Sequence, residues 1–175
     1  MCGIIGMINS EKEVAADIMA GMMSLQHRGQ DACGILTCDE NIIHMRKEKG
    51  EVRKLMEKTK ASSLCGKLGI GHTRYPTKGT TDDADSQPLF VNSSEKISIA
   101  HNGNVTNYFE AEENLRKEGS FLSTQVDVEV ILQLFSRNYE KTKDYFSSVE
   151  KVLKEIEGAY SVVGTISDKA LFAFR

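Results

Sequence analysis

Residues 1–6 read MCGIIG, which places a cysteine directly behind the initiator methionine at the start of an apolar segment. Residues 2–8 are short, apolar and interrupted by glycine, a pattern that predicts a buried strand starting almost at the first residue. Removal of Met1 would leave a thiol and a free α-amine together on Cys2. An unperturbed thiol has a pKa of about 8.5 and an α-amine about 7.7–8.0, so the amine could accept the thiol proton. For Met-Cys alone, a buried strand cysteine is the favoured interpretation.

Hydrophobic periodicity organises the rest of the chain into blocks. Helices are expected at residues 11–29, 51–60, 107–118, 127–139 and 147–156, and strands at 32–37, 41–45, 67–72, 97–100, 159–166 and 170–174. Residues 75–88 have loop chemistry, and residues 101–104 (HNGN) give a turn signal. Since helices and strands are grouped rather than strictly alternating, stacked sheets flanked by helices are favoured over a doubly wound sheet.

The length and composition indicate one ordinary globular domain over residues 1–175. The chain is 40% hydrophobic and 27% charged with two prolines, and a domain of this size can bury roughly 70% of its unfolded surface. The 22 basic and 25 acidic residues give a net charge of -3 and form no basic face, so a nucleic acid partner is not expected. The sequence contains neither a membrane-length apolar run nor a signal peptide, which predicts a cytoplasmic protein.

Four cysteines stand at positions 2, 33, 38 and 65. Without a secretory signal they are expected to be reduced rather than paired in disulfides. Cys33 and Cys38 have no matching Cys or His pair nearby, so the spacing gives little support for zinc. We therefore expect no metal site and no cofactor in this domain, and interpret Cys33, Cys38 and Cys65 as small buried hydrophobic residues.

Four motifs occur in one order along the chain. They are MCGIIG at residues 1–6, LQHRGQDACGI at 25–35, GIGHTRYPTKG at 69–79 and AHNGNVTN at 100–107. Together these motifs resemble those of class II glutamine amidotransferases. Within that class, LQHRGQ and RYPT are similar to the N-terminal domain of amidophosphoribosyltransferases, and the resemblance extends to the final LFAFR.

The resemblance implies an α+β N-terminal-nucleophile hydrolase fold with four layers, αββα, in which two stacked antiparallel sheets lie between helical layers and the nucleophile begins a central strand. It also implies that Cys2 attacks the carboxamide carbon of glutamine, releasing ammonia and leaving a glutamyl thioester that water hydrolyses. Asn102 and the backbone N–H of Gly103 would form the oxyanion hole. Taken alone, Asn-Gly is a hairpin turn signal, and a turn could present the same N–H.

The resemblance further implies how glutamine, a zwitterion, is recognised. Arg74 would bind the α-carboxylate, Asp127 the α-ammonium, and Thr77 would add a hydroxyl contact. Arg28 lies in a motif that closes over the substrate in relatives, a motion that Gly29 would permit. Two departures are present: valines flank Asp127 where relatives commonly have small hydroxyl residues, and Cys33 replaces a small alanine.

Other functions remain open from the sequence. His72 and His101 permit a papain-type Cys-His mechanism, although both belong to motifs in which the α-amine serves as base. A peptidase and a non-catalytic glutamine-sensing or scaffold subunit are further alternatives, and the intact set of motif residues argues against the latter.

The synthase that would use the ammonia is a separate question. Relatives continue past the LFAFR-like segment into a phosphoribosyltransferase domain, which is absent from this chain. The expected partners are therefore glutamine and a phosphoribosyltransferase domain or subunit of purine biosynthesis. A different acceptor synthase and a homo-oligomer both stay open.

Overall fold

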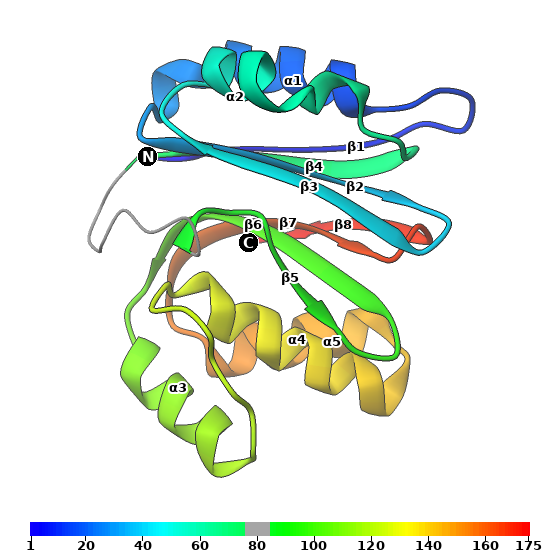
Figure 1. Ribbon diagram of the computed structural model, residues 1–175. Coiled ribbons are helices and arrows are strands. Elements are labelled where there is room, and N and C mark those ends of the chain that lie inside the picture. Colours follow the sequence, from blue (N-terminus) through cyan, green and yellow to red (C-terminus); the bar gives the residue numbers. More distant parts are fainter. Residues whose placement is uncertain (76–84) are drawn as a thin grey trace.

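The computed structural model describes residues 1–75 and 85–175, and its strands form two antiparallel four-stranded sheets. The first sheet has the order β1 (Gly3–Ile8), β4 (Leu68–Arg74), β2 (Ala32–Asp39), β3 (Ile42–Lys49). The second has the order β5 (Leu89–Asn92), β6 (Lys96–Val105), β7 (Gly158–Ile166), β8 (Ala170–Phe174). Figure 1 shows the two sheets stacked face to face.

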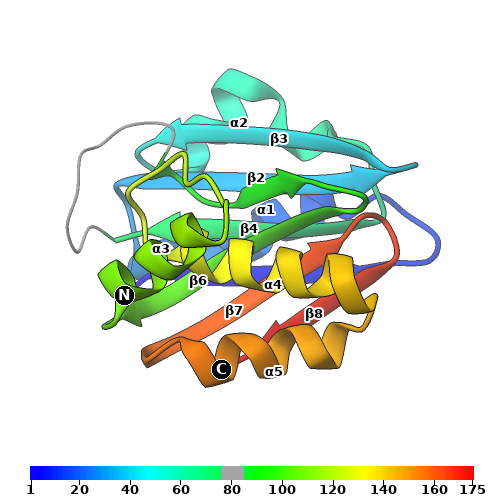
Figure 2. The ribbon, with the colours of Figure 1, turned by 90° about the horizontal axis from the view of Figure 1, so that it is seen from below.

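Helices cover the outer face of each sheet. On the first sheet lie α1 (Ala15–Ser24) and α2 (Val52–Thr59), accompanied by two short 3-10 turns, η1 (Gln26–Arg28) and η2 (Ala61–Ser63). On the second lie α4 (Val128–Thr142) and α5 (Tyr145–Glu155), side by side across the strands in Figure 2, with α3 (Tyr108–Lys117) near one end. The predicted α+β architecture of four layers, αββα, is confirmed.

Each boundary between layers has its own apolar cluster. Ile18, Met19 and Met22 of α1 are fully buried against the first sheet. On the other side, the ring of Phe135 in α4 stacks on Phe172 at a centroid distance of 4.5 Å. Between the sheets the buried layer is small and consists of Leu36, Cys38, Ile70, Ala100 and Val163. The layer between the sheets keeps them at a fixed spacing, which the site between them requires.

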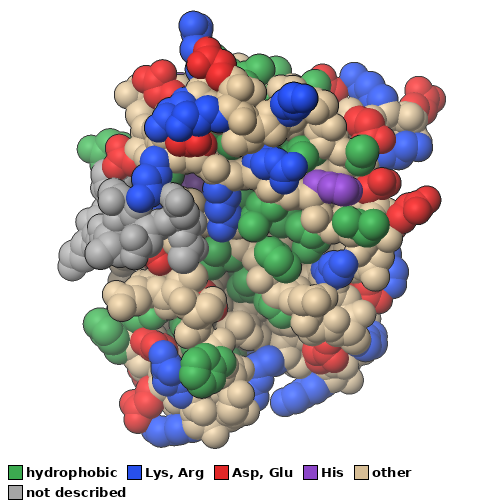
Figure 3. Space-filling model, viewed as in Figure 1, with side chains coloured by type: hydrophobic (Ala, Val, Ile, Leu, Met, Phe, Trp, Pro, Cys, Tyr) green, Lys and Arg blue, Asp and Glu red, His purple; other side chains and the backbone are tan. Residues whose placement is uncertain are grey.

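The surface mixes both signs of charge. On the face shown in Figure 3, Lys and Arg side chains are interspersed with Asp and Glu, and hydrophobic side chains lie between the two helical layers. None of the helices in the described ranges is both long and apolar enough to cross a membrane.

The strand that begins at Gly3 has the predicted position in the sequence but lies at the edge of its sheet. It pairs with β4 in the register Gly3↔Thr73 to Ile8↔Leu68 and has no second neighbour among the described strands. The prediction that the nucleophile begins a central strand is therefore wrong: among the described strands, β1 is an edge strand. An edge position leaves the start of β1 free to approach the second sheet.

The predicted helix at residues 11–29 is too long, and the loop chemistry of its first residues explains why. The side chain of Asn9 accepts hydrogen bonds from the backbone N–H groups of Glu11 and Lys12, at 2.8 and 3.1 Å. Such an Asx turn competes with helix formation, so α1 begins only at Ala15. The short strand β5, which follows Pro88, was not predicted from the sequence.

The turn predicted at residues 101–104 is also wrong. These residues continue β6, which pairs with β7 without interruption from Ile97↔Ile166 to Val105↔Gly158. Gly103 has a φ of +155°, and a Cβ there would lie 2.2 Å from the carbonyl oxygen of Ala159. The glycine therefore permits a close approach between two strands rather than a chain reversal.

Candidate active site

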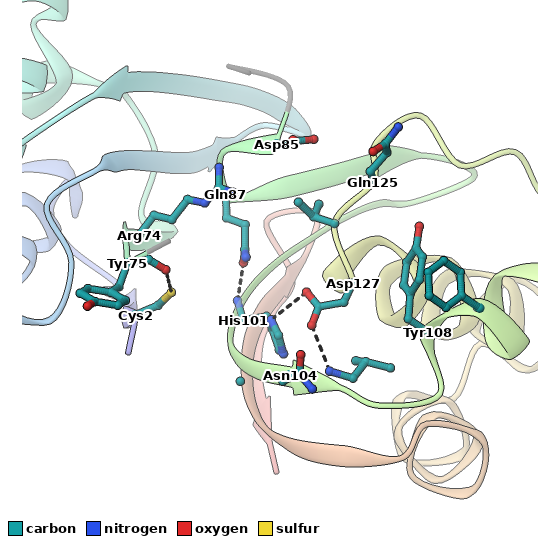
Figure 4. Close-up of a pocket in the computed structure, with 14 residues that line it drawn as sticks. Cys2, Arg74, Tyr75, Asp85, Gln87, His101, Asn104, Tyr108, Gln125 and Asp127 are labelled. Atoms are coloured by element: carbon teal, nitrogen blue, oxygen red, sulfur yellow. Dashed lines mark hydrogen bonds and ion pairs between the residues drawn. The ribbon is translucent and has the colours of Figure 1, made fainter. Parts of the chain in front are cut away.

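A cavity of about 270 Å³ opens where Cys2, just before β1, meets the end of β4 and the end of β6. Four of the sequence-predicted site residues line it: Cys2, Arg74, Gly103 and Asp127. Figure 4 shows Cys2 and Arg74 on one side and Asp127 on the other. Small-ligand pockets commonly measure ~300–1,000 Å³, so this cavity suits a ligand of amino-acid size.

The backbone at Cys2 is fixed to both sheets. The N–H of Cys2 donates to Asn102 Oδ1 at 3.0 Å, across 100 residues of sequence, and the next N–H, of Gly3, donates to Thr73 Oγ1 at 3.2 Å. The Cys2 Sγ lies 3.8 Å from the carbonyl oxygen of Tyr75. Since the amide oxygen of Asn102 faces Cys2 N, its NH2 group is directed elsewhere and remains a donor for another partner.

Arg28 also holds Cys2, but from outside the cavity lining. Its Nε donates to the Cys2 carbonyl oxygen at 2.9 Å. The turn that carries it is clamped by Gln26, whose amide donates to the carbonyl of Gly29 at 2.6 Å and accepts from the N–H of Val52 at 2.6 Å. A Cβ at Gly29 would lie 2.4 Å from the backbone of Arg74, so in this structure Gly29 serves close packing.

Along β6, alternate N–H groups point away from β7 and toward the cavity. The N–H of His101 donates to Gln87 Oε1 at 2.6 Å, and the N–H of Val105 donates to Asp127 Oδ2 at 3.0 Å. Alternate residues of a strand direct their backbone groups to the same side, so the N–H of Gly103 lies between these two. It therefore faces the cavity that Gly103 lines.

Arg74 and Asp127 supply opposite charges to the same cavity. Arg74 is the last residue of β4 and is half-buried, and Asp127 immediately precedes α4 with 27% of its side chain exposed. One oxygen of Asp127 is held by the N–H of Val105, and the other lies 3.8 Å from His101 Nδ1. Thr77, the remaining predicted contact, lies outside the described residues.

The two buried histidines do not contact the thiol. His72 is fully buried, and its Nε2 lies 3.2 Å from the His101 carbonyl oxygen. Burial lowers the pKa of His72 to about 3, with a further lowering from the neighbouring His101. Burial also lowers the pKa of His101, against the opposing effect of Asp127. A lowered pKa makes an imidazole a weaker proton acceptor, which disfavours the papain-type alternative for both histidines.

Sequence reasoning missed several residues of the cavity wall. Gln87 is buried and holds β6 through His101, and Tyr108 stands at the start of α3. Burial, with Glu112 adding to it, raises the pKa of Tyr108 to about 12, so its hydroxyl stays protonated. Gln87 lies in an irregular segment and Tyr108 in an amphipathic helix, and neither context carries a motif. Further lining residues are Tyr75, Asp85, Asn104, Phe109, Gln125 and Val126.

The other cysteines lie away from this cavity. Cys33 and Cys38 are buried on β2, and Cys65 is exposed rather than buried as expected. Burial raises the pKa of the Cys33 thiol to about 12 and also raises that of Cys38, so both are held as inert thiols. Within the described ranges, no group of three His, Cys, Asp or Glu side chains could hold a metal ion.

The sequence from His72 to the end carries a recognised domain. Residues 72–175 match the glutamine amidotransferase domain. The chain belongs to this family. The predicted class II resemblance is thereby confirmed, and the domain is that of an enzyme.

Known relatives agree with this assignment over the whole chain. It is 37% identical to the amidophosphoribosyltransferase of Pseudomonas aeruginosa and 40% identical to that of Methanocaldococcus jannaschii, in each case over 100% of this chain. The glutamine–fructose-6-phosphate aminotransferase of Sulfolobus acidocaldarius is 34% identical over 98% of it. The chain spans only 36%, 37% and 30% of these three relatives.

A solved structure supports the fold. The glutamine phosphoribosylpyrophosphate amidotransferase of B. subtilis, complexed with ADP and GMP, superposes with a TM-score of 0.82 at 29% identity. The match covers 95% of this chain and 35% of the B. subtilis chain. With the two stacked sheets between helices, this match confirms the N-terminal-nucleophile hydrolase fold.

The buried His72 predicts a pH dependence of stability. The unfolded chain binds a proton at this group below a pH of about 6.5, whereas the folded chain does not until about 3. The contribution of His72 to the free energy of unfolding is therefore complete above a pH of about 6.5. It falls as the pH drops toward 3, by up to about 1.4 kcal/mol per pH unit. His72→Gln, which keeps a donor for the His101 carbonyl, should flatten this slope in urea unfolding between pH 6 and 4. The exposed His27→Gln is the control, and equal slopes in wild type and His72→Gln would contradict the prediction.

Proposed function

We propose that this domain hydrolyses glutamine to glutamate and ammonia, with Cys2 as nucleophile after removal of Met1. The observation that carries the proposal is the hydrogen bond of 3.0 Å from Cys2 N to Asn102 Oδ1. It fixes the nitrogen that would become the free α-amine next to the thiol and at the edge of the cavity. Met1 itself is 74% exposed, so it is accessible for removal.

The first chemical step needs a proton acceptor for the thiol. The α-amine of Cys2 takes the thiol proton, directly or through water, and Sγ attacks the carboxamide carbon. The tetrahedral intermediate collapses as the amine returns the proton to the departing nitrogen, so ammonia leaves and a glutamyl thioester remains. Water then attacks the thioester, which releases glutamate and restores the thiol.

The negative oxygen of the tetrahedral intermediate needs donors already in place. The N–H of Gly103 lies in the row of β6 groups that faces the cavity, between two N–H groups whose acceptors are Gln87 and Asp127. The NH2 of Asn102 is not directed at Cys2 N, since its oxygen occupies that position. Asn102 and Gly103 are therefore proposed as the oxyanion hole.

Glutamine recognition is assigned to two opposite charges. Arg74 can bind the α-carboxylate with two parallel hydrogen bonds, and Asp127 can accept from the α-ammonium. Support comes from their positions on opposite sides of the cavity, with Cys2 beside Arg74. Thr77 and Arg28 remain proposed contacts, and Arg28 would have to exchange its bond to the Cys2 carbonyl to take part.

The ammonia acceptor is proposed to be a phosphoribosyltransferase domain or subunit, which would make the whole activity that of amidophosphoribosyltransferase in purine biosynthesis. Curated relatives with that name align with the entire chain. A different synthase remains the second candidate because an aminotransferase for fructose-6-phosphate is 34% identical. No observation favours a non-catalytic glutamine sensor.

Glutaminase activity should depend on both the thiol and a free amine at Cys2. Cys2→Ser should lower kcat by at least about 1,000-fold, because a serine hydroxyl is a much weaker nucleophile near neutral pH. Intact-mass analysis of active protein should show that Met1 is absent. Cys65→Ser, which changes an exposed thiol outside the cavity, is the matched control. Full activity in protein that retains Met1 would refute the amine as base.

Substitutions in the two proposed subsites should affect different kinetic constants. Asn102→Ala should lower kcat about 100- to 1,000-fold, because an oxyanion donor acts in the transition state. Arg74→Lys should raise the KM for glutamine about tenfold and change kcat less, since a point charge loses the bidentate geometry. Steady-state rates over a range of glutamine concentrations measure both. An unchanged kcat in Asn102→Ala would exclude it from the oxyanion hole.

The proposed acceptor should control the glutaminase rate. We expect the chain alone to hydrolyse glutamine slowly, and a phosphoribosyltransferase partner with bound phosphoribosyl pyrophosphate to lower the KM. In this structure Arg28 binds the Cys2 carbonyl, and closure over glutamine would have to break that bond. If the closed state of the isolated chain is a minority population, the apparent affinity for glutamine falls by that fraction. The assay compares rates with and without partner and pyrophosphate. A full rate without any partner would contradict the coupling.

A further inference from the structure

Glu129 is a buried carboxylate outside the cavity that none of the steps above uses. It stands in the first turn of α4 and is 4% exposed. Its Oε1 accepts from the backbone N–H and the hydroxyl of Ser123, at 2.8 and 2.9 Å, and its Oε2 accepts from the same two groups of Thr124, at 2.7 and 2.6 Å. These are distances typical of charge-assisted hydrogen bonds.

The segment held by Glu129 is the one that leads into the cavity wall. Gln125, Val126 and Asp127 follow Thr124 directly, and all three line the cavity. Two further bonds close the turn: the N–H of Val126 contacts Thr124 Oγ1 at 3.4 Å, and the N–H of Glu129 donates to the Val126 carbonyl at 3.1 Å. Asp127 is therefore connected to the Glu129 carboxylate through both its preceding and its following residues.

The immediate neighbours of Asp127 cannot orient its carboxylate by hydrogen bonding. Val126 and Val128 have no polar side-chain atom, and Val128 is fully buried in the apolar cluster under α4. Beyond its bond to Val105 N and its 3.8 Å approach to His101 Nδ1, the direction of Asp127 is set by the path of the backbone, which Glu129 holds. The burial of an ionised carboxylate is tolerated because both of its oxygens are fully satisfied.

We propose that Glu129 is a positioning residue for substrate: by holding Ser123 and Thr124 it keeps Asp127 aimed at the α-ammonium group of glutamine. This role rests on the proposed function of Asp127. The hydrogen bonds also explain why a carboxylate suits position 129. Four donors converge on two oxygens, and only an ionised carboxylate accepts at every site without presenting a donor of its own.

Glu129→Gln tests the role with almost no change in shape. The NH2 group of the introduced glutamine would face one hydroxyl and one backbone N–H. The hydroxyl can rotate to accept a hydrogen bond from it, but the backbone N–H cannot. If the segment is then ordered in about a tenth of the molecules, the KM for glutamine rises about tenfold while kcat falls less than about twofold. Ser136→Ala, which removes another buried polar group two turns later on α4, should change neither constant by more than about twofold.

Labelling of Cys2 separates positioning from general damage to the fold. A glutamine analogue with an electrophilic carbon in place of the carboxamide needs Asp127, whereas iodoacetamide carries no ammonium group. Glu129→Gln should slow labelling by the analogue about tenfold and leave the iodoacetamide rate unchanged. Equal slowing by both reagents, or an unchanged KM and analogue rate, would overturn the positioning role.

Two milder substitutions keep the test decisive if Glu129→Gln does not fold. Ser123→Ala and Thr124→Val each remove one hydroxyl donor and leave the carboxylate and both backbone N–H groups. Each should raise the KM about threefold and the pair about tenfold, and an unchanged KM in the folded double variant would refute the assignment. Wild-type protein that neither hydrolyses glutamine nor is labelled at Cys2 by the analogue would instead refute the proposed function itself, and the positioning role with it.

Discussion

The hydrogen bond between Cys2 N and Asn102 Oδ1 is the constraint on which the rest of the site depends. It joins the residue immediately before the edge strand β1 of one sheet to β6 of the other, so the two sheets must keep a fixed spacing and register. The small apolar layer between the sheets sets that spacing, and Arg28 and Thr73 hold the peptide group between Cys2 and Gly3. A nucleophile at the end of a chain would otherwise fray, as chain termini do.

Strand β6 contributes backbone groups as well as side chains. Its N–H groups at His101 and Val105 are occupied by Gln87 and Asp127, and the N–H of Gly103 lies between them on the same side. Any side chain at position 103 would meet the backbone of β7 and would require an unfavourable φ. The same glycine therefore permits tight pairing with one neighbour and leaves the opposite side of the strand clear for a ligand.

The sequence predicted those parts of the structure that depend on local pattern. The strand after Cys2, the strands β2 and β3 and the helices follow from hydrophobic periodicity. The four layers and the pocket residues Cys2, Arg74, Gly103 and Asp127 follow from the family resemblance. One error arose where tertiary pairing overrides a local signal. Asn102-Gly103 is typical of a turn, but pairing with β7 keeps it extended. Gln87 was missed because its contact with the His101 N–H depends on the fold. Glu129 was missed although its partners, Ser123 and Thr124, lie only six and five residues before it.

Two carboxylates near the start of α4 differ in how much accepting capacity they retain. An ionised carboxylate has about four acceptor sites. Glu129 is buried and receives four donors from its own segment, so it has no capacity for a ligand. Asp127 is partly exposed, and the described hydrogen bonds give it one backbone N–H on Oδ2, with Oδ1 3.8 Å from a histidine whose pKa is lowered by burial. The spare acceptor sites thus belong to the carboxylate that lines the cavity, and a cationic group of the ligand is the partner that can use them.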